Sequence, residues 1–114
     1  MTTKVYKTTP PMARQEAESA FSSGSPEQIA DALVRVAFND PDWRWVQEKC
    51  LTFLDNPTSD VRRLAVTCLG HLARIHGEID RERVLPLLNI LRKDDEVSGT
   101  VEDTLEDIEA FTGS

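Results

Sequence analysis

The sequence lacks a long apolar segment. No run of hydrophobic residues approaches the roughly 18 that a membrane-spanning helix needs. The N-terminal stretch MTTKVYKTTPPMAR has two lysines but no apolar region after them, so no secretory signal is visible. Hydrophobic residues still make up 39% of the chain, which is too many for a disordered one. We therefore expect a soluble, cytoplasmic protein that does not contact a membrane.

Glycine and cysteine are also scarce, and this argues against several kinds of active site. The five glycines form no glycine-rich phosphate loop, and no serine lies in a Gly-x-Ser-x-Gly elbow. Cys50 and Cys68 lie in apolar helical patterns, where burial keeps a reduced thiol inert. His71 and His76 are five residues apart and do not share a helix face as a zinc pair does. We expect no cofactor, no metal site and no enzyme activity.

Basic residues are absent from the C-terminal segment. Residues 94–114 contain eight acidic residues and no base, whereas all 13 lysines and arginines lie in residues 1–93, where they nearly balance the acids. An acidic segment repels the phosphates of nucleic acid and attracts a cationic protein surface. The alternative is an acidic helix that serves only solubility.

What the sequence does contain is a series of helical patterns, and no period-two run of β-branched residues long enough for a strand. Start signals stand at Ser25-Pro26 with Gln28, at Asp40-Pro41 and at Asp80. Pro86 lies inside the fifth pattern, where proline narrows or kinks the early turns of a helix. The expected helices cover about 11–22, a segment from Pro26, about 41–55, a segment from Asn56-Pro57-Thr58 to Gly77, a segment after Asp80, and a segment from about Val97–Gly99.

The apolar positions of these helices repeat. A shift of 32 residues places Phe21, Ile29, Leu33 and Val36 on Phe53, Val61, Ala65 and Cys68, and a shift of the last three by 40 places them on Val101, Leu105 and Ile108. Three helix pairs therefore share one template, and no pair can bury both of its apolar faces alone. We predict an all-α fold: a short α-solenoid of about six antiparallel helices in one domain, residues 11–114, preceded by a flexible tail, residues 1–10.

The middle pair carries a recognisable pattern. The run Leu54-Asp55-Asn56-Pro57, Asp60-Val61-Arg62, Ala65 and Leu69-Gly70 resembles the signature of the HEAT repeat, the two-helix unit of armadillo-type α-solenoids. The resemblance implies that Asp60 and Arg62 form an ion pair between neighbouring units. The third unit has acids, Glu102 and Asp103, where the arginine should be, which is consistent with a terminal cap.

A second resemblance covers the whole chain. The segments DPDWRWVQ, LGHLARIHG and VEDTLEDIEAF are similar to those of small bacterial HEAT-like immunity proteins of contact-dependent and polymorphic toxin systems. It implies that the chain binds and occludes a cognate toxin domain. Toxins that cut nucleic acid are usually basic, so the resemblance agrees with the acidic C-terminal segment.

The expected binding residues lie on the outward stripes of the fourth and sixth helices, with Trp45 of the third helix in addition, and two alternatives stand for each. One alternative to a binding role is that these side chains are simply solvated. For Trp45 the alternatives are an interface anchor and a cover for the edge of the core, since Trp43 takes the inward position and Gln47 lies to the side. The candidates are Trp45, Arg63, Thr67, His71, Arg74, Asp103, Glu106 and Asp107.

Other functions stay open. A structural or adaptor module would associate through its outer helices, and a HEAT-scaffold enzyme for a small molecule or chromophore would need an aromatic pocket, which 6% aromatic residues furnish poorly. Nucleic-acid binding is not expected, because no aromatic residue is interleaved with the arginines. The oligomeric state is open, with a monomer favoured.

Overall fold

Six α-helices make up the part of the chain that the structure describes. The structure is a computed structural model, it describes residues 9–112, and within this range it contains no β-strand. The predicted all-α fold is therefore confirmed for these residues. The helices are α1 (Arg14–Phe21), α2 (Pro26–Asn39), α3 (Trp43–Thr52), α4 (Ser59–His76), α5 (Arg81–Leu91) and α6 (Ser98–Thr112).

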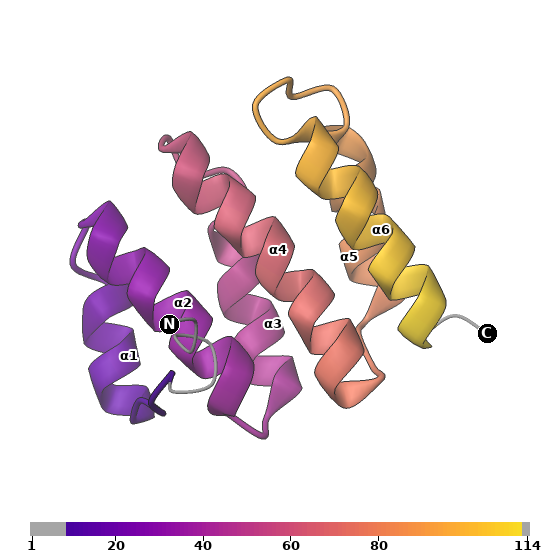
Figure 1. Cartoon of the computed structure of the whole chain (residues 1–114). Helices are drawn as coiled ribbons and strands as arrows, with labels where there is room; N and C mark the ends of the chain where they lie inside the picture. The colour runs from indigo at the N-terminus through magenta and orange to yellow at the C-terminus, as the bar shows by residue number, and fades with distance from the viewer. Residues whose placement is uncertain (1–8, 113–114) are drawn as a thin grey trace, which may run out of the picture.

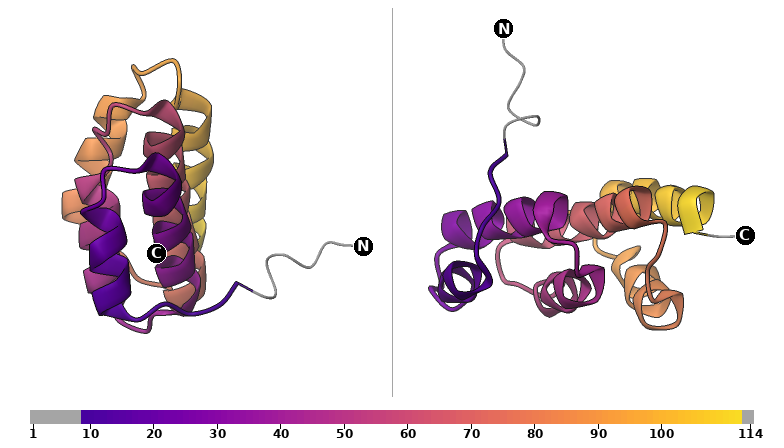
Figure 2. Two further views of the ribbon diagram at one scale, coloured as in Figure 1. Left: turned by 90° about the vertical axis from the view of Figure 1, so that its left-hand side faces the viewer. Right: turned by 90° about the horizontal axis from the view of Figure 1, so that it is seen from below.

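The helices form three antiparallel hairpins, α1–α2, α3–α4 and α5–α6, which stand side by side along the molecule (Figure 1). Seen along the helices, α2, α4 and α6 make one layer and α1, α3 and α5 make the other (Figure 2). The molecule measures 31 × 31 × 29 Å along its principal axes. Each hairpin thus contributes one helix to each layer. None of the described helices is long and apolar enough to cross a membrane.

Helix α4 is the centre of the core. It has 18 residues, packs between α2 and α6, and buries residues on several sides. The apolar positions that repeat in the sequence are buried in each hairpin: Ile29 in the first, Val61 in the second and Val101 in the third. Leu105 is only half-buried, since no hairpin within residues 9–112 covers the far side of α6. The buried residues of α4 are Val61, Ala65, Val66, Cys68, Leu69, Gly70, Leu72 and Ala73.

The start of α2 agrees with the prediction, whereas the capping residue of α3 differs from the predicted one. The Ser25 side chain accepts the Gln28 amide N–H as predicted, so α2 begins at Pro26. The cap of α3 is Asp42, whose carboxylate accepts the Trp45 N–H at 3.2 Å, and not Asp40. Asp40 accepts the Asp42 N–H instead, at 2.8 Å. Residues 40–42 therefore form a turn before the helix, and α3 begins at Trp43 and not at the predicted Pro41.

The connection from α4 to α5 depends on a buried glutamine. Gly77 ends α4 in a left-handed conformation, with φ 67°, as its position predicts. Asp80 precedes α5 but its side chain caps no amide. Its own N–H donates to Gln47 Oε1 at 2.7 Å, and Gln47 is 2% exposed. The expectation that Gln47 lies at the side of α3 was wrong, because its amide satisfies this backbone group.

Helix α6 packs on α4 through a polar contact as well as apolar ones. Thr104 is buried, and its hydroxyl donates to the Val66 carbonyl at 3.1 Å. The absence of a side chain at Gly70 allows this approach, since a Cβ there would stand 3.4 Å from Thr104 Oγ1 and 3.2 Å from Asp107 Oδ2. Phe111, in the last turn of α6, is 50% exposed.

Arg62 joins the second hairpin to the third. Its guanidinium donates to Asp94 at 3.1 Å and to Glu96 at 2.9 Å, both in the segment before α6. Asp60 pairs with Arg63 of its own helix instead. The predicted Asp60–Arg62 pair was therefore wrong: Arg62 links the two units through acids of the next hairpin, without Asp60.

The predicted N-terminal tail, residues 1–10, lies mostly outside the described residues. Its described part is held on α2, because Asn39 donates to the Thr9 carbonyl at 3.2 Å and Arg35 donates to the Pro10 carbonyl at 3.1 Å. The segment before α1 therefore runs beside the layer formed by α2, α4 and α6.

Candidate protein-binding surface

Seven of the eight predicted binding residues come together on one surface. Helices α4 and α6 are neighbours in one layer, so their outward stripes adjoin (Figure 1). Arg74, Asp103 and Glu106 are exposed, and the other four are half-buried. We call this set the α4–α6 surface; it consists of Arg63, Thr67, His71, Arg74, Asp103, Glu106 and Asp107.

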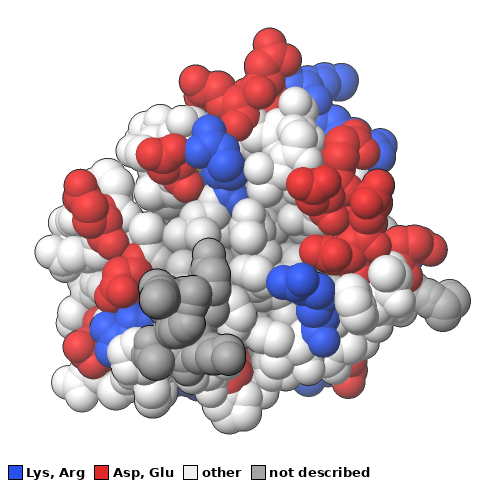
Figure 3. Space-filling model, viewed as in Figure 1, with Lys and Arg blue, Asp and Glu red and all other residues white. Residues whose placement is uncertain are grey.

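Acidic side chains gather over α6 on this face (Figure 3). Two of the α6 carboxylates are committed to ion pairs at its edges, Glu102 with Arg92 and Glu109 with Arg81. Asp103 makes no hydrogen bond or ion pair within the described chain. The same holds for Glu106. Two exposed carboxylates are therefore available to a partner's cation.

The α4 side of the surface is less positive than the sequence suggests. Arg63 is paired with Asp60, and it also donates to the Glu96 carbonyl. Burial lowers the pKa of His71, the Arg74 charge lowers it further, and Asp107 partly opposes both. His71 Nδ1 lies 2.9 Å from the Arg74 guanidinium, which can only donate, so this nitrogen accepts. His71 is thus neutral near pH 7 and positions Arg74.

Trp45 is not part of the α4–α6 surface. It lies in the other layer, half-buried, where its indole N–H donates to Glu18 of α1 at 3.2 Å. The Arg14 guanidinium stands 4.4 Å from the centre of its ring, and Lys49 donates to the same Glu18 carboxylate at 2.8 Å. These contacts favour the interpretation in which Trp45 covers the edge of the core, at the junction of α1 and α3.

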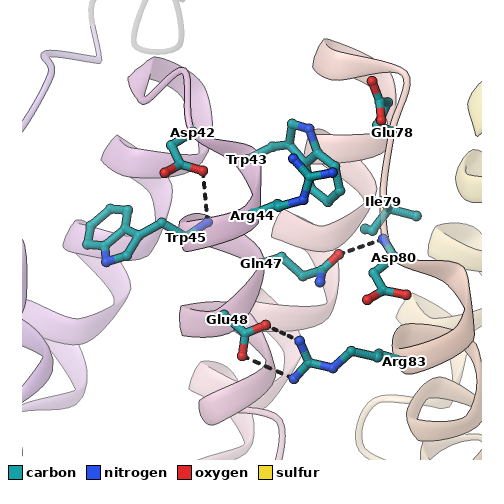
Figure 4. Close-up of a pocket in the computed structure, with 10 residues that line it drawn as sticks. All are labelled: Asp42, Trp43, Arg44, Trp45, Gln47, Glu48, Glu78, Ile79, Asp80 and Arg83. Atoms are coloured by element: carbon teal, nitrogen blue, oxygen red, sulfur yellow. Dashed lines mark hydrogen bonds and ion pairs between the residues drawn. The ribbon is translucent and has the colours of Figure 1, made fainter.

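The other tryptophan lines a cleft that the sequence did not reveal. Trp43, predicted to face inward, is half-buried and stands at a cleft of about 760 Å³ between α3 and the start of α5 (Figure 4). Two tryptophans two residues apart cannot share a helix face. This spacing was the one sign in the sequence that an indole would stand outside the core. The lining residues are Asp42, Trp43, Arg44, Trp45, Gln47, Glu48, Glu78, Ile79, Asp80 and Arg83.

Three of the six charged side chains that line this cleft are in ion pairs: Asp42 with Arg14, and Glu48 with Arg83. A hydrogen-bonded ion pair with Arg83 lowers the pKa of Glu48 and ties α3 to α5. The Arg44 guanidinium lies 4.6 Å from the centre of the Trp43 ring. Glu78 and Asp80 form neither hydrogen bonds through their carboxylates nor ion pairs within residues 9–112. The uncommitted carboxylates therefore outnumber the uncommitted guanidinium.

The two cysteines lie away from both features. Cys50 and Cys68 are buried free thiols in the interface of α3 and α4. A hydrogen bond with Cys68 and burial together raise the pKa of the Cys50 thiol well above its usual range. Within residues 9–112, no three His, Cys, Asp or Glu side chains are grouped so that they could hold a metal ion. This thiol is protonated near neutral pH, as its apolar surroundings predicted.

Comparison with known proteins finds similarity to a solved structure. No protein-family model and no curated protein matches the chain. A solved structure described as the crystal structure of a CDI complex from Cupriavidus taiwanensis LMG 19424 contains a similar chain. The two chains are 33% identical and superpose with a TM-score of 0.80, and the alignment covers 90% of this chain and 91% of the other. The similarity therefore extends over all three hairpins.

Proposed function

The chain belongs to the family of the protein that it matches in the CDI complex from Cupriavidus taiwanensis, and we propose from this membership that it is an immunity protein, which binds a toxin domain and neutralises it in the cytoplasm. The match over nearly the whole of both chains is the observation that carries the proposal. The segments that resemble immunity proteins of contact-dependent toxin systems support it independently. The expected activity is binding, without catalysis.

The proposal includes a HEAT-repeat architecture. Three stacked hairpins, the buried positions that recur in them and the Arg62 link between the second and third hairpins all support it. Stacked repeats leave a layer of parallel second helices open to a partner. In this protein that layer consists of α2, α4 and α6, and it includes the α4–α6 surface.

The α4–α6 surface is the proposed contact region. Asp103 and Glu106 lose no internal bond when they pair with a partner's lysine or arginine. The net charge of −7 attracts a basic domain during the encounter, and the attraction weakens as salt is added. We expect a basic, nuclease-type toxin whose active site is covered by the bound immunity protein.

Charge reversal tests this contact region. The toxin domain, expected to be encoded directly upstream, is purified with the full chain and its affinity is measured by calorimetry at two salt concentrations. The double change Asp103→Lys, Glu106→Lys should weaken binding roughly tenfold or more, because two attractive contacts become repulsive. Protection of cells that express the toxin should fall in parallel.

A control with the same change in net charge separates local contact from long-range attraction. Glu16→Lys with Asp55→Lys reverses two exposed acids elsewhere, neither of which pairs with a described residue. This variant should retain most of the affinity. Equal losses in the two variants would contradict the α4–α6 surface as the contact region, and failure of the native chain to bind the toxin would contradict the function itself.

A further inference from the structure

We propose that the cleft between α3 and α5 receives an arginine or lysine side chain of the protein partner, together with the backbone carbonyl of the peptide segment that carries it. The inference rests on the proposed function in naming the toxin domain as the source of that segment. The chemistry of the cleft follows from its own residues. It defines a second contact region, in the layer opposite to the α4–α6 surface.

The cleft is held open by its own walls. Helices α3 and α5 belong to the same layer but pack against other helices, α4 and α6. They are joined across the cleft by the Glu48–Arg83 ion pair and by the bond from the Asp80 N–H to Gln47 (Figure 4). The resulting volume of about 760 Å³ is in the range of ligand pockets. A long side chain can therefore enter without rearrangement of the core.

Gln47 presents a hydrogen-bond donor to the cleft. The atom of its amide that faces the Asp80 N–H at 2.7 Å must be the oxygen, because an N–H cannot accept from another N–H. The NH2 group is therefore turned away from α5, and it makes no hydrogen bond with any described residue. Gln47 is 2% exposed and lines the cleft, so its position is fixed. A peptide carbonyl is the acceptor that this fixed donor fits.

The charge of the cleft selects a cation. The carboxylates of Glu78 and Asp80 make no hydrogen bond or ion pair within residues 9–112, while Arg83 is paired with Glu48 and also feels the nearby Asp80 charge. Trp43 adds an apolar wall against which the methylene stem of lysine or arginine can pack. Arg44 already stands over the Trp43 ring, so the incoming charge belongs at the carboxylates and not on the indole.

A tripeptide probe tests this chemistry without the toxin. N-acetyl-Gly-Arg-Gly-amide is titrated into the 15N-labelled full chain, and the Gln47 side-chain NH2 and Trp43 indole N–H are followed by NMR. Both signals should shift with a millimolar dissociation constant, while the Trp45 indole N–H, which donates to Glu18 on the α1 side, should shift much less. The same peptide with citrulline in place of arginine has nearly the same shape and no charge, and it should shift them at least fivefold less.

Neutral variants provide the second arm. Glu78→Gln with Asp80→Asn should weaken probe binding roughly fivefold, since each exposed charge contributes modestly. Asp80 caps no amide, so the fold should persist. The matched control is Glu82→Gln with Asp55→Asn, two exposed acids outside the cleft. Equal binding of the citrulline peptide, or an unchanged affinity in the cleft variant, would overturn the proposal.

The toxin measurement assigns the partner. The cleft variant should lose about fivefold in toxin affinity, additional to the loss from the α4–α6 surface. If the native chain binds the arginine peptide but not the toxin, the proposed function fails while the cation site stands. If the toxin binds the cleft variant as tightly as the native chain, the cleft is not part of that complex and the inference is overturned.

Discussion

The two tryptophans of α3 lie in different environments. Trp43 and Trp45 are separated by one residue, and the pattern favoured Trp43 for the core. The structure half-buries both, Trp45 against α1 and Trp43 beside the cleft. Each indole is large enough to cover two environments, so side-chain pattern alone does not decide which partner it meets. The neighbouring hairpins decide it.

At the residue scale we predict a pH dependence from Glu18. A hydrogen bond from Lys49, and a weaker one from Trp45, lower the pKa of Glu18 below its ordinary value of 4.5. A lowered pKa stabilises the fold at pH above 4.5, and this contribution is lost as the pH falls through the folded-state pKa. Glu18→Gln should therefore reduce the free energy of unfolding at pH 6, by less than about 1 kcal/mol because the carboxylate is partly exposed.

Urea unfolding at pH 6 and at pH 3.5 measures this effect. The difference between native and variant should shrink at the lower pH. Glu16→Gln, an exposed change on the same helix, provides the control and should show no such trend. A deficit in Glu18→Gln that stays equal at both pH values would show that packing, and not the ionised carboxylate, accounts for it.

At the scale of elements, helix ends were predicted correctly where the capping group comes from residues next to the helix end. Ser25 and Gly77 act as predicted, since a cap and a left-handed turn need only neighbouring residues. The start of α5 differs, because Gln47 from α3 satisfies a backbone group there. That contact joins residues far apart in sequence, which no local signal reports.

The left-handed end of α4 predicts the effect of a substitution there. Gly77 has φ 67°, a conformation that costs other residues about 1 kcal/mol. Gly77→Ala should therefore lower the free energy of unfolding by about 1 kcal/mol in urea titrations followed by circular dichroism. Gly99→Ala offers the matched control, because Gly99 lies in the first turn of α6 with open space around its Cα.

For the control we expect no loss, or a small gain from the higher helix propensity of alanine. Similar destabilisation at both positions would argue against the strain at Gly77 as the cause. An unchanged stability of Gly77→Ala would show that the end of α4 relaxes without cost.

At the scale of the whole molecule, the three hairpins share one core. Helix α4 packs against both α2 and α6, and the α6 contact includes the buried Thr104 bond to Val66 and the close approach at Gly70. A hairpin removed from the stack would leave an apolar surface in water. The stability of each hairpin is therefore expected to depend on its neighbours.

Removal of the third hairpin tests this dependence. A chain that ends at Gly77 exposes the side of α4 that α6 covers, and it should lose cooperative unfolding or aggregate. In the full chain, tryptophan fluorescence, which reports on the second hairpin, should unfold at the same urea concentration as the helical circular dichroism signal. Separate transitions in the full chain, or an unchanged cooperative transition in the shortened one, would contradict a single shared core.

The sequence by itself determined the helical class, the approximate helix positions and the repeated core, because periodicity, turn residues and caps act over a few residues. It also placed seven binding candidates on helices whose stripes adjoin. The tertiary structure alone decided the cleft, the burial of Gln47 and Thr104, and the partners of Arg62 and Trp45. These features arise where hairpins meet. The distances and angles there depend on how side chains pack, as at Gly70, where the lack of a side chain lets α6 approach α4 closely.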